Sequence, residues 1–538
     1  MPLRRLQQSA LLLFAALLCL PVIAVVASWL QWNATSAQIL GEMAATVLPG
    51  YLLTTVVLCV LVAIGVVVVG TATAAAVTLF DFPLRRTFEW ALLLPLATPA
   101  YVVAYAYTDF LQYSGPLQTS MRSFWGLQGA LWPDVRSLWG AAVVLSCSLY
   151  PYVYLLTRTA LADRAPQLME AARLLGAGLS RRIFRVALPL ARPAIAAGVA
   201  LALMETLADF GVSSYFGIQT FTAGIYKAWL VMDNRWAAAQ LSTFLLLMVA
   251  LVLLLEQRAQ ARLRFVSSRA SGQSHESQPL QLRGWHAGLA IFLCLMPILL
   301  GFVLPLAIMG HALWQSSLYQ PLPWWDFAHW VWNSLRLGAV TAVLAVAIAL
   351  MLAHSVRMQP SFWRRFSTQL VGLGYAVPGV VIVVGLLLPV AWLQSQWPNS
   401  QVGYWLTATV LGLVWAYLVR FIAVALQSVQ SGYARISSST DESARMLGIA
   451  GWSLFARVHW PLMTRASAAA LLLVWVDVMK ELPATLVLRP FNTDTLAVVA
   501  YQLARDERLG EAALPSLALV LVGLIPVLML SKTLRKST

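Results

Sequence analysis

The chain alternates between long apolar runs and short polar segments. Twelve of the runs approach or exceed the ~20 residues that a helix needs to cross a bilayer core of roughly 30 Å. Because backbone groups in lipid must satisfy their hydrogen bonds within the segment, we predict helices and not strands. The predicted spans cover about 10–30, 51–79, 88–110, 138–160, 191–213, 237–256, 287–313, 330–355, 367–393, 403–427, 463–486 and 513–531.

One polar segment occurs twice with identical spacing. In each copy a glutamate is followed by two small residues, by a glycine six positions after the glutamate, and by a proline thirteen positions further on. Self-similarity over this distance indicates a duplicated architecture. The first copy contains Glu170, Ala171, Ala172, Gly176 and Pro189, and the second contains Glu442, Ser443, Ala444, Gly448 and Pro461.

The duplication predicts two halves of six spans each. An even number of spans gives both halves the same orientation, so they are parallel repeats. Prolines in the third span of each half, Pro99 and Pro378, predict kinks. The predicted parts are a first repeat at 1–256 with its core at about 51–256, a polar linker at 257–286, and a second repeat at 287–538 with its core at about 330–531; the repeated segments occupy about 163–190 and 434–462.

The repeated segments are predicted to be hairpins of two helices. Each would be a short helix, a tight turn and a second basic helix that leads back into the membrane. Gly176 and Gly448 suit a helix stop in the left-handed conformation, and the stretch 439–442 has a capping-box pattern. A single basic loop of this kind would be read as packing on the protein's own helices. Two copies with one spacing favour docking of an external partner.

Composition places the chain in a membrane. Hydrophobic residues make up 60% and charged residues 11%, and the mean hydropathy is +0.76, whereas soluble domains are about a quarter charged. The net charge of +15 fits the arginine excess on cytoplasmic loops better than nucleic-acid binding. Placing the N-terminus in the cytoplasm puts most of the 36 lysines and arginines inside. Both termini and both repeated segments are then cytoplasmic, and the first apolar run is an uncleaved helix.

Ionisable residues also lie within the predicted spans. Glu205 and Asp209 are four residues apart in the fifth span, and Asp477 and Glu481 occupy the matching positions 272 residues later, with Lys480 between them. Each intramembrane acid costs roughly 2.5–3.5 kcal/mol on insertion scales, so these side chains should avoid lipid. They could line a translocation path, form buried ion pairs with Lys480, or form an outer gate. His354 and His459 are interpreted as lone packing residues, with no metal assigned.

Sequence motifs give no sign of a catalytic apparatus. We find no phosphate-binding loop, no His-Glu-x-x-His and no Cys-x-x-Cys pattern. The four cysteines lie in apolar runs without metal-ligand spacing.

The repeated segment resembles the "EAA" loop of ABC-importer permeases, with Ser443 and Trp460 as mild departures in the second copy. The stretches 205–211, 222–226 and 480–485 make the chain similar to fused iron(III) permeases. The resemblance implies the type I importer permease fold in the bacterial inner membrane, surrounded by lipid. It also implies a periplasmic binding protein and two copies of an ABC ATPase that uses ATP and Mg, with no cofactor and no nucleic acid bound by this chain.

Three other functions remain open from the residues alone. The same type of permease could carry thiamine, a polyamine, sulfate or another small solute. The intramembrane acids could instead serve as proton sites of a secondary transporter, although two matching docking segments argue against this. The third possibility is a membrane scaffold without transport.

Overall fold

The computed structural model describes residues 2–30, 34–264, 280–449 and 451–536, and it is built almost entirely of helices. Within these residues eleven helices are long and apolar enough to cross a membrane, or twelve if the bent pair at 85–125 counts as one span. This confirms the all-α polytopic fold class. The predicted linker lies largely outside the described residues, because 265–279 are not among them.

The helices of the first half are α1 (Pro2–Ala27), α2 (Ala34–Thr46), α3 (Leu48–Leu79), α4 (Arg85–Ala91), α5 (Ala100–Leu111), α6 (Pro116–Trp125), α7 (Leu138–Leu174), α8 (Leu179–Arg182), α9 (Leu188–Ala208), α10 (Gly211–Tyr215), α11 (Phe221–Tyr226) and α12 (Arg235–Arg264). Those of the second half are α13 (Trp285–Ile298), α14 (Leu304–Tyr319), α15 (Trp324–Met358), α16 (Phe362–Gly372), α17 (Gly379–Gln396), α18 (Val402–Thr407), α19 (Val410–Ala434), α20 (Ser438–Met446), α21 (Trp452–Leu454), α22 (Trp460–Lys480), α23 (Pro483–Leu488), α24 (Leu496–Arg505) and α25 (Leu509–Lys536). Two short strands, β1 (Phe80–Asp81) and β2 (Leu280–Gln281), pair in parallel.

The third span of each half is broken at the predicted proline. Pro99 and Pro378 sit at the N-caps of α5 and α17 with nearly the same backbone angles, φ −58°, ψ 138° and φ −59°, ψ 140°. Proline fixes φ and pushes the preceding residue out of the helical region, and Thr98 and Val377 are indeed extended. In the first half the two pieces are bent by 87°.

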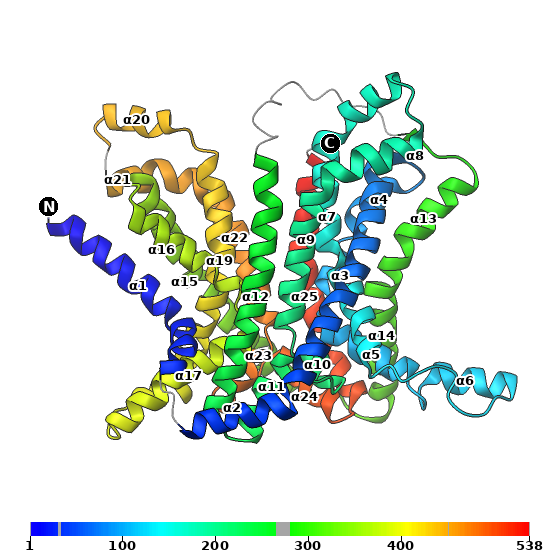
Figure 1. Cartoon of the computed structure of the whole chain (residues 1–538), viewed down its shortest axis with the longest axis horizontal. Helices are drawn as coiled ribbons and strands as arrows, with labels where there is room; N and C mark the ends of the chain where they lie inside the picture. The colour runs from blue at the N-terminus through cyan, green and yellow to red at the C-terminus, as the bar shows by residue number, and fades with distance from the viewer. Residues whose placement is uncertain (1, 31–33, 265–279, 450, 537–538) are drawn as a thin grey trace. The chain divides into compact units, whose positions relative to one another are not determined.

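The chain folds into two compact units that are interleaved along the sequence (Figure 1). Unit 1 contains 1–42, 225–244 and 323–499, and unit 2 contains 43–224, 245–322 and 500–538. In unit 1, α1 of the first half packs against α16 and α17 of the second half. In unit 2, α14 and α25 of the second half pack against each other and against parts of the first half. The repeat boundaries predicted from the duplication stay a prediction.

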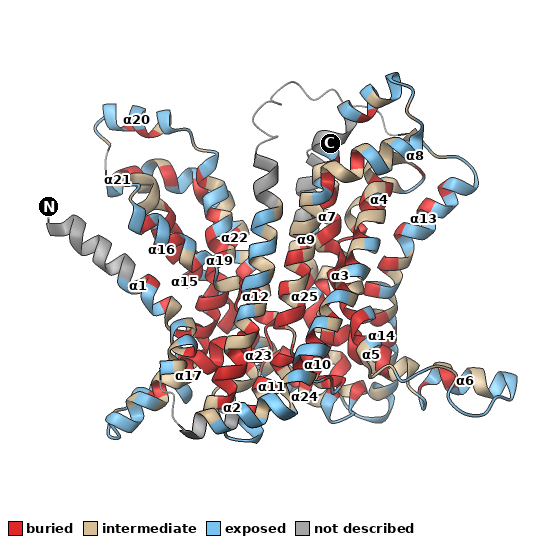
Figure 2. Ribbon diagram, in the orientation of Figure 1, coloured by how far each residue is buried: buried red, intermediate tan, exposed pale blue. Residues whose placement is uncertain are grey.

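Each unit is built around three helices in the same order. These are α3, α7 and α9 in unit 2, and α15, α19 and α22 in unit 1. Small residues allow close approach, since a Cβ at Gly198 of α9 would lie 2.6 Å from the Val153 Cα of α7. Figure 2 shows buried residues along these helices and exposed residues on α20. The repeated segments join the second and third helix of each set.

Candidate functional site: the two repeated segments

The two repeated segments share one backbone geometry at their turns. Gly176 and Gly448 have φ of +79° and +77°, the left-handed conformation predicted for a helix stop. The amide of Gly176 donates to Arg173 O and that of Gly448 to Arg445 O, both at 3.0 Å. After each turn, a short helix and one π-helical turn lead to a proline at the second position of α9 or α22.

The segments differ in the helix that precedes the turn. In the first copy α7 runs without a break to Leu174, so the separate short helix predicted there is wrong. In the second copy α19 ends at Ala434 and α20 is a separate helix, as predicted (Figure 1). The predicted capping box is not formed, because Ser437 is the N-cap and makes no side-chain cap bond. Its hydroxyl instead contacts the hydroxyls of Ser439 and Thr440.

Each segment exposes one acid and a pair of large apolar side chains. Glu170 and Glu442 are exposed, and so are their neighbours Ala171 and Ser443, whereas Ala172 is half-buried and Ala444 is buried. The last side chains before each glycine are among the most exposed of the described residues: Leu174 85%, Leu175 88%, Met446 89% and Leu447 79%. Apolar side chains presented this way at matching positions favour a protein-docking role.

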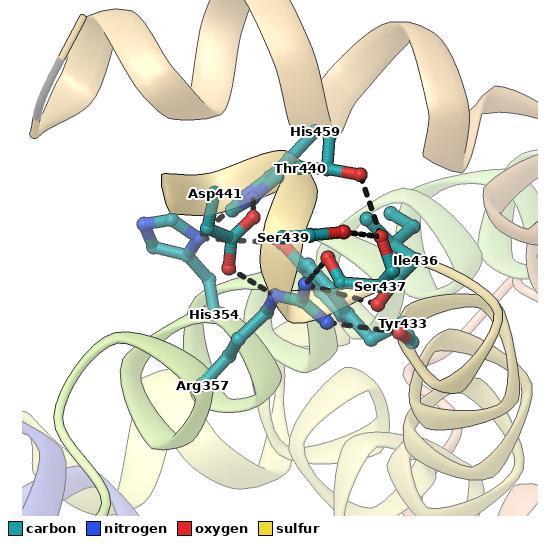
Figure 3. Close-up of polar contacts among 9 residues, drawn as sticks. All are labelled: His354, Arg357, Tyr433, Ile436, Ser437, Ser439, Thr440, Asp441 and His459. Carbon is teal, nitrogen blue, oxygen red and sulfur yellow. Dashed lines mark hydrogen bonds and ion pairs between the residues drawn. The ribbon is translucent and has the colours of Figure 1, made fainter. Parts of the chain in front are cut away.

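A polar cluster lies behind α20 (Figure 3). Asp441 accepts a bond from Arg357 Nε at 2.8 Å and lies 2.8 Å from Nε2 of the fully buried His459. The Arg357 guanidinium also donates to three backbone carbonyls between α19 and α20, those of Tyr433 at 2.9 Å, Ile436 at 3.0 Å and Ser437 at 3.1 Å. One arginine therefore bridges the break that separates the two helices.

His354 and His459 are not lone residues. Their Nδ1 atoms are 3.2 Å apart, and the Tyr433 hydroxyl lies 3.3 Å from His354 Nδ1. Within the described residues, no group of three or more His, Cys, Asp or Glu side chains is arranged to hold a metal ion. Sequence reasoning missed this cluster because nothing in the spacing joins residue 354 to residue 459. The acid directly before Glu442 was the one visible signal.

The cluster stays ionised at neutral pH. Burial alone would raise the pKa of the Asp441 carboxyl, but hydrogen bonds from Arg357 and His459 outweigh it and lower the pKa below its ordinary value of 3.8. A carboxylate with a lowered pKa stabilises the fold fully above its unfolded value, and this stabilisation is lost as the pH falls through the folded value. The attachment of α20 is therefore lost only in strong acid.

Two of the predicted intramembrane acids are helix caps. Asp209 and Glu481 lie just past the ends of α9 and α22 with ψ of 129° and 124°, so the helices end earlier than the predicted 213 and 486. Asp209 Oδ2 accepts from the amide and the hydroxyl of Ser213, both at 3.0 Å. Glu481 accepts from the amides of Ala484 and Thr485, both at 3.0 Å. Each buried carboxylate thus begins the next short helix, α10 or α23.

Glu481 is in addition half of an ion pair. Its side chain is 1% exposed and lies 3.6 Å from Arg420 Nη1 of α19, which is 11% exposed. The ion-pair interpretation had named Lys480 as the partner, and Arg420 was not considered. Glu205 on α9 and Asp477 and Lys480 on α22 occupy half-buried positions.

Replacing Gly448 with alanine is a small test of the shared turn. A Cβ there would meet nothing within 4 Å, so the cost is the left-handed backbone alone, about 1–2 kcal/mol. We expect faster hydrogen exchange in peptides covering 438–449, with Ser443→Ala as a helical control that changes nothing. Unchanged exchange in the glycine variant would show that the turn is not needed to hold α20.

Comparisons with known proteins agree with this architecture. Residues 66–265 match the family model described as the binding-protein-dependent transport system inner membrane component. The Fe(3+)-transport system permease protein FbpB 2 of Haemophilus influenzae is 25% identical over 486 residues, covering 89% of this chain and 88% of that protein. The ferric transport system permease protein FbpB of Actinobacillus pleuropneumoniae is 22% identical, over 77% of this chain and 61% of the relative.

A shorter similarity involves a permease for a different solute. The maltose/maltodextrin transport system permease protein MalG of Vibrio parahaemolyticus is 28% identical over 31% of this chain and 55% of its own length. The matched family model, the nearly full-length likeness to FbpB 2 and the set of apolar helices together identify the chain as a multi-pass inner-membrane permease of the binding-protein-dependent ABC-importer type.

Proposed function

We propose that this permease carries ferric ion, delivered by a periplasmic binding protein, into the cytoplasm. The likeness to FbpB 2 extends over nearly the whole chain, including both repeated segments, and supports this substrate. Carboxylate oxygens are hard ligands suited to a passing ferric ion or its chelate. Both chain termini and both repeated segments face the cytoplasm in this proposal.

The proposal assigns the repeated segments to ATPase docking. The observation that carries it is that two matching turns each present an exposed glutamate and an exposed apolar pair. Two equivalent segments suit two copies of an ATPase subunit, or one two-fold symmetric dimer. In this assignment ATP and Mg are used by the partner, and the present chain converts hydrolysis into alternating access. Its own ligands are lipid and the transported ion.

Reconstitution tests both parts of the proposal. The permease is purified with the ATPase and placed in liposomes with a ferric-loaded binding protein, and ATP hydrolysis and iron uptake are measured together. We expect hydrolysis to rise only when the loaded binding protein is present, and uptake to follow it. Stimulation by a thiamine, polyamine or sulfate binding protein, with none from the ferric one, would instead assign another solute.

The secondary-transporter alternative makes the opposite forecast. A proton-coupled carrier would take up iron along a pH gradient without ATP or the ATPase subunit. Uptake of that kind in the same liposomes would overturn the assignment of the repeated segments.

The acids Glu205 and Asp477 are proposed to line the translocation path. Replacing both with alanine removes two oxygen ligands from that path, and we expect iron uptake to fall about tenfold, equivalent to ~1.4 kcal/mol. The ATPase should still co-purify, because neither residue lies in a repeated segment. Glu507→Ala, at an exposed acid, serves as the control. Normal uptake by the double variant would remove the path role.

A further inference from the structure

The polar cluster behind α20 has an apolar counterpart in the other half. Moving back by the repeat distance of 272 residues, each cluster member in the second repeated segment falls on an apolar residue of the first. Those apolar residues form one buried hydrophobic cluster of unit 2, together with Leu79 and Ala191. The matched pairs are Leu161 and Tyr433, Met169 and Asp441, and Ala187 and His459.

Equivalent elements contribute to both clusters. Leu161 and Met169 come from α7, and Ala187 from the π-helical turn before α9. In unit 1, Tyr433 ends α19, Asp441 lies in α20 and His459 closes the π-helical turn before α22. The first long helix of each set adds its last turns, through Leu79 of α3 and His354 of α15. The same place in the repeat is thus filled by apolar packing once and by charges once.

The two kinds of contact suit the helices that they hold. In the first half α7 is continuous, so its final turns need only lateral packing, and apolar contact is non-directional. In the second half the backbone between α19 and α20 is broken, and its carbonyls need donors. Arg357 supplies those donors and at the same time fixes Asp441 at 2.8 Å. Its planar fork of donors is directional, so it sets an orientation as well as a position.

We propose that Arg357, Asp441 and His459 are positioning residues that hold α20 so that the adjacent Glu442 faces the ATPase, and that the first repeated segment is held by apolar packing alone. The inference rests on the docking function proposed above. It implies that one permease presents two docking segments of unequal sensitivity to the loss of charge.

Spin labels at matched positions test this attachment directly. A nitroxide is placed at Ser443→Cys or, 272 residues earlier, at Ala171→Cys, both exposed, in a chain whose four native cysteines, Cys19, Cys59, Cys147 and Cys294, are replaced. We expect Asp441→Ala to convert the label at 443 to a mobile spectrum and to leave the label at 171 unchanged. Met169→Ala, the matched apolar truncation, should leave both labels immobile.

A double-mutant cycle identifies the network. Arg357→Ala and Asp441→Ala each release the same helix, so the combined variant should be no more mobile at 443 than either alone; independent contributions would add. Asp441→Asn keeps the shape and loses the charge, so it decides the matter if the alanine variant is not recovered folded. An immobile label at 443 in the asparagine variant, or equal mobility from Met169→Ala, would overturn the proposal.

A second measurement separates this inference from the docking function. In liposomes with the ATPase and the loaded binding protein, we expect Asp441→Asn to lower the stimulated hydrolysis rate about tenfold and to leave KM for ATP unchanged. A mobile label with normal stimulated hydrolysis would keep the attachment network and reject the docking role of α20. A normal label spectrum with lowered hydrolysis would do the reverse.

Discussion

Alanine at both Glu170 and Glu442 is expected to separate the permease from its ATPase. Both glutamates are exposed and lie one helical turn or more before the exposed apolar pair of their segment. A charged group lost from a docked interface costs affinity, and tenfold corresponds to about 1.4 kcal/mol per site. Because the two sites bind one partner assembly, the losses multiply. Co-purification and iron uptake should both fall about a hundredfold in the double variant, and by about tenfold in each single one.

The fold of this double variant should be unchanged, since both side chains project into solvent. Thermal unfolding in detergent checks this. Asp506→Ala, which removes an exposed acid outside the repeated segments, is the control for lost charge and should retain the ATPase. Full attachment and uptake by the double variant would refute the docking role of both segments.

Alanine at Glu481 is expected to have the largest effect on stability. The change removes the cap of α23 and the carboxylate partner of the buried Arg420. Removing one member of a buried ion pair typically costs 3–5 kcal/mol. The matching acid, Asp209, caps α10, and no ion pair of its carboxylate is recorded among the described residues. Asp209→Ala should cost about 1 kcal/mol, as for a lost cap.

The pair of variants is compared by thermal unfolding of purified permease and by the amount recovered from membranes. A lower transition temperature for Glu481→Ala than for Asp209→Ala is the expected order. Glu481→Gln keeps the size and part of the capping, so it should fall between the alanine variant and the parent chain. The opposite order would mean that the ion pair with Arg420 contributes little.

The spans were predictable because their signal is local. A long apolar run identifies a helix in lipid without reference to the rest of the chain, and the breaks at Pro99 and Pro378 follow from proline's own geometry. The left-handed turns at Gly176 and Gly448 were predictable for the same reason. Span ends were harder, since α9 stops where a carboxylate captures the next amides.

The contacts of the candidate site were not predictable from one sequence. Arg420 and Glu481 are 61 residues apart, on α19 and at the end of α22, and only packing brings them together. The same holds for His354 and His459. An exchange of charged for apolar residues between the two copies was visible once the register was known, but a register shows equivalence and not contact.

The interleaving of the two units has a consequence for biosynthesis. The helix made first, α1, packs against α16 and α17, which leave the ribosome only after most of the chain has been translated. Until then α1 must be accommodated by lipid or by the insertion machinery. A polypeptide cut within the linker would give two fragments that each lack packing partners for an outer helix, so neither fragment should mature unless both are made in the same cell.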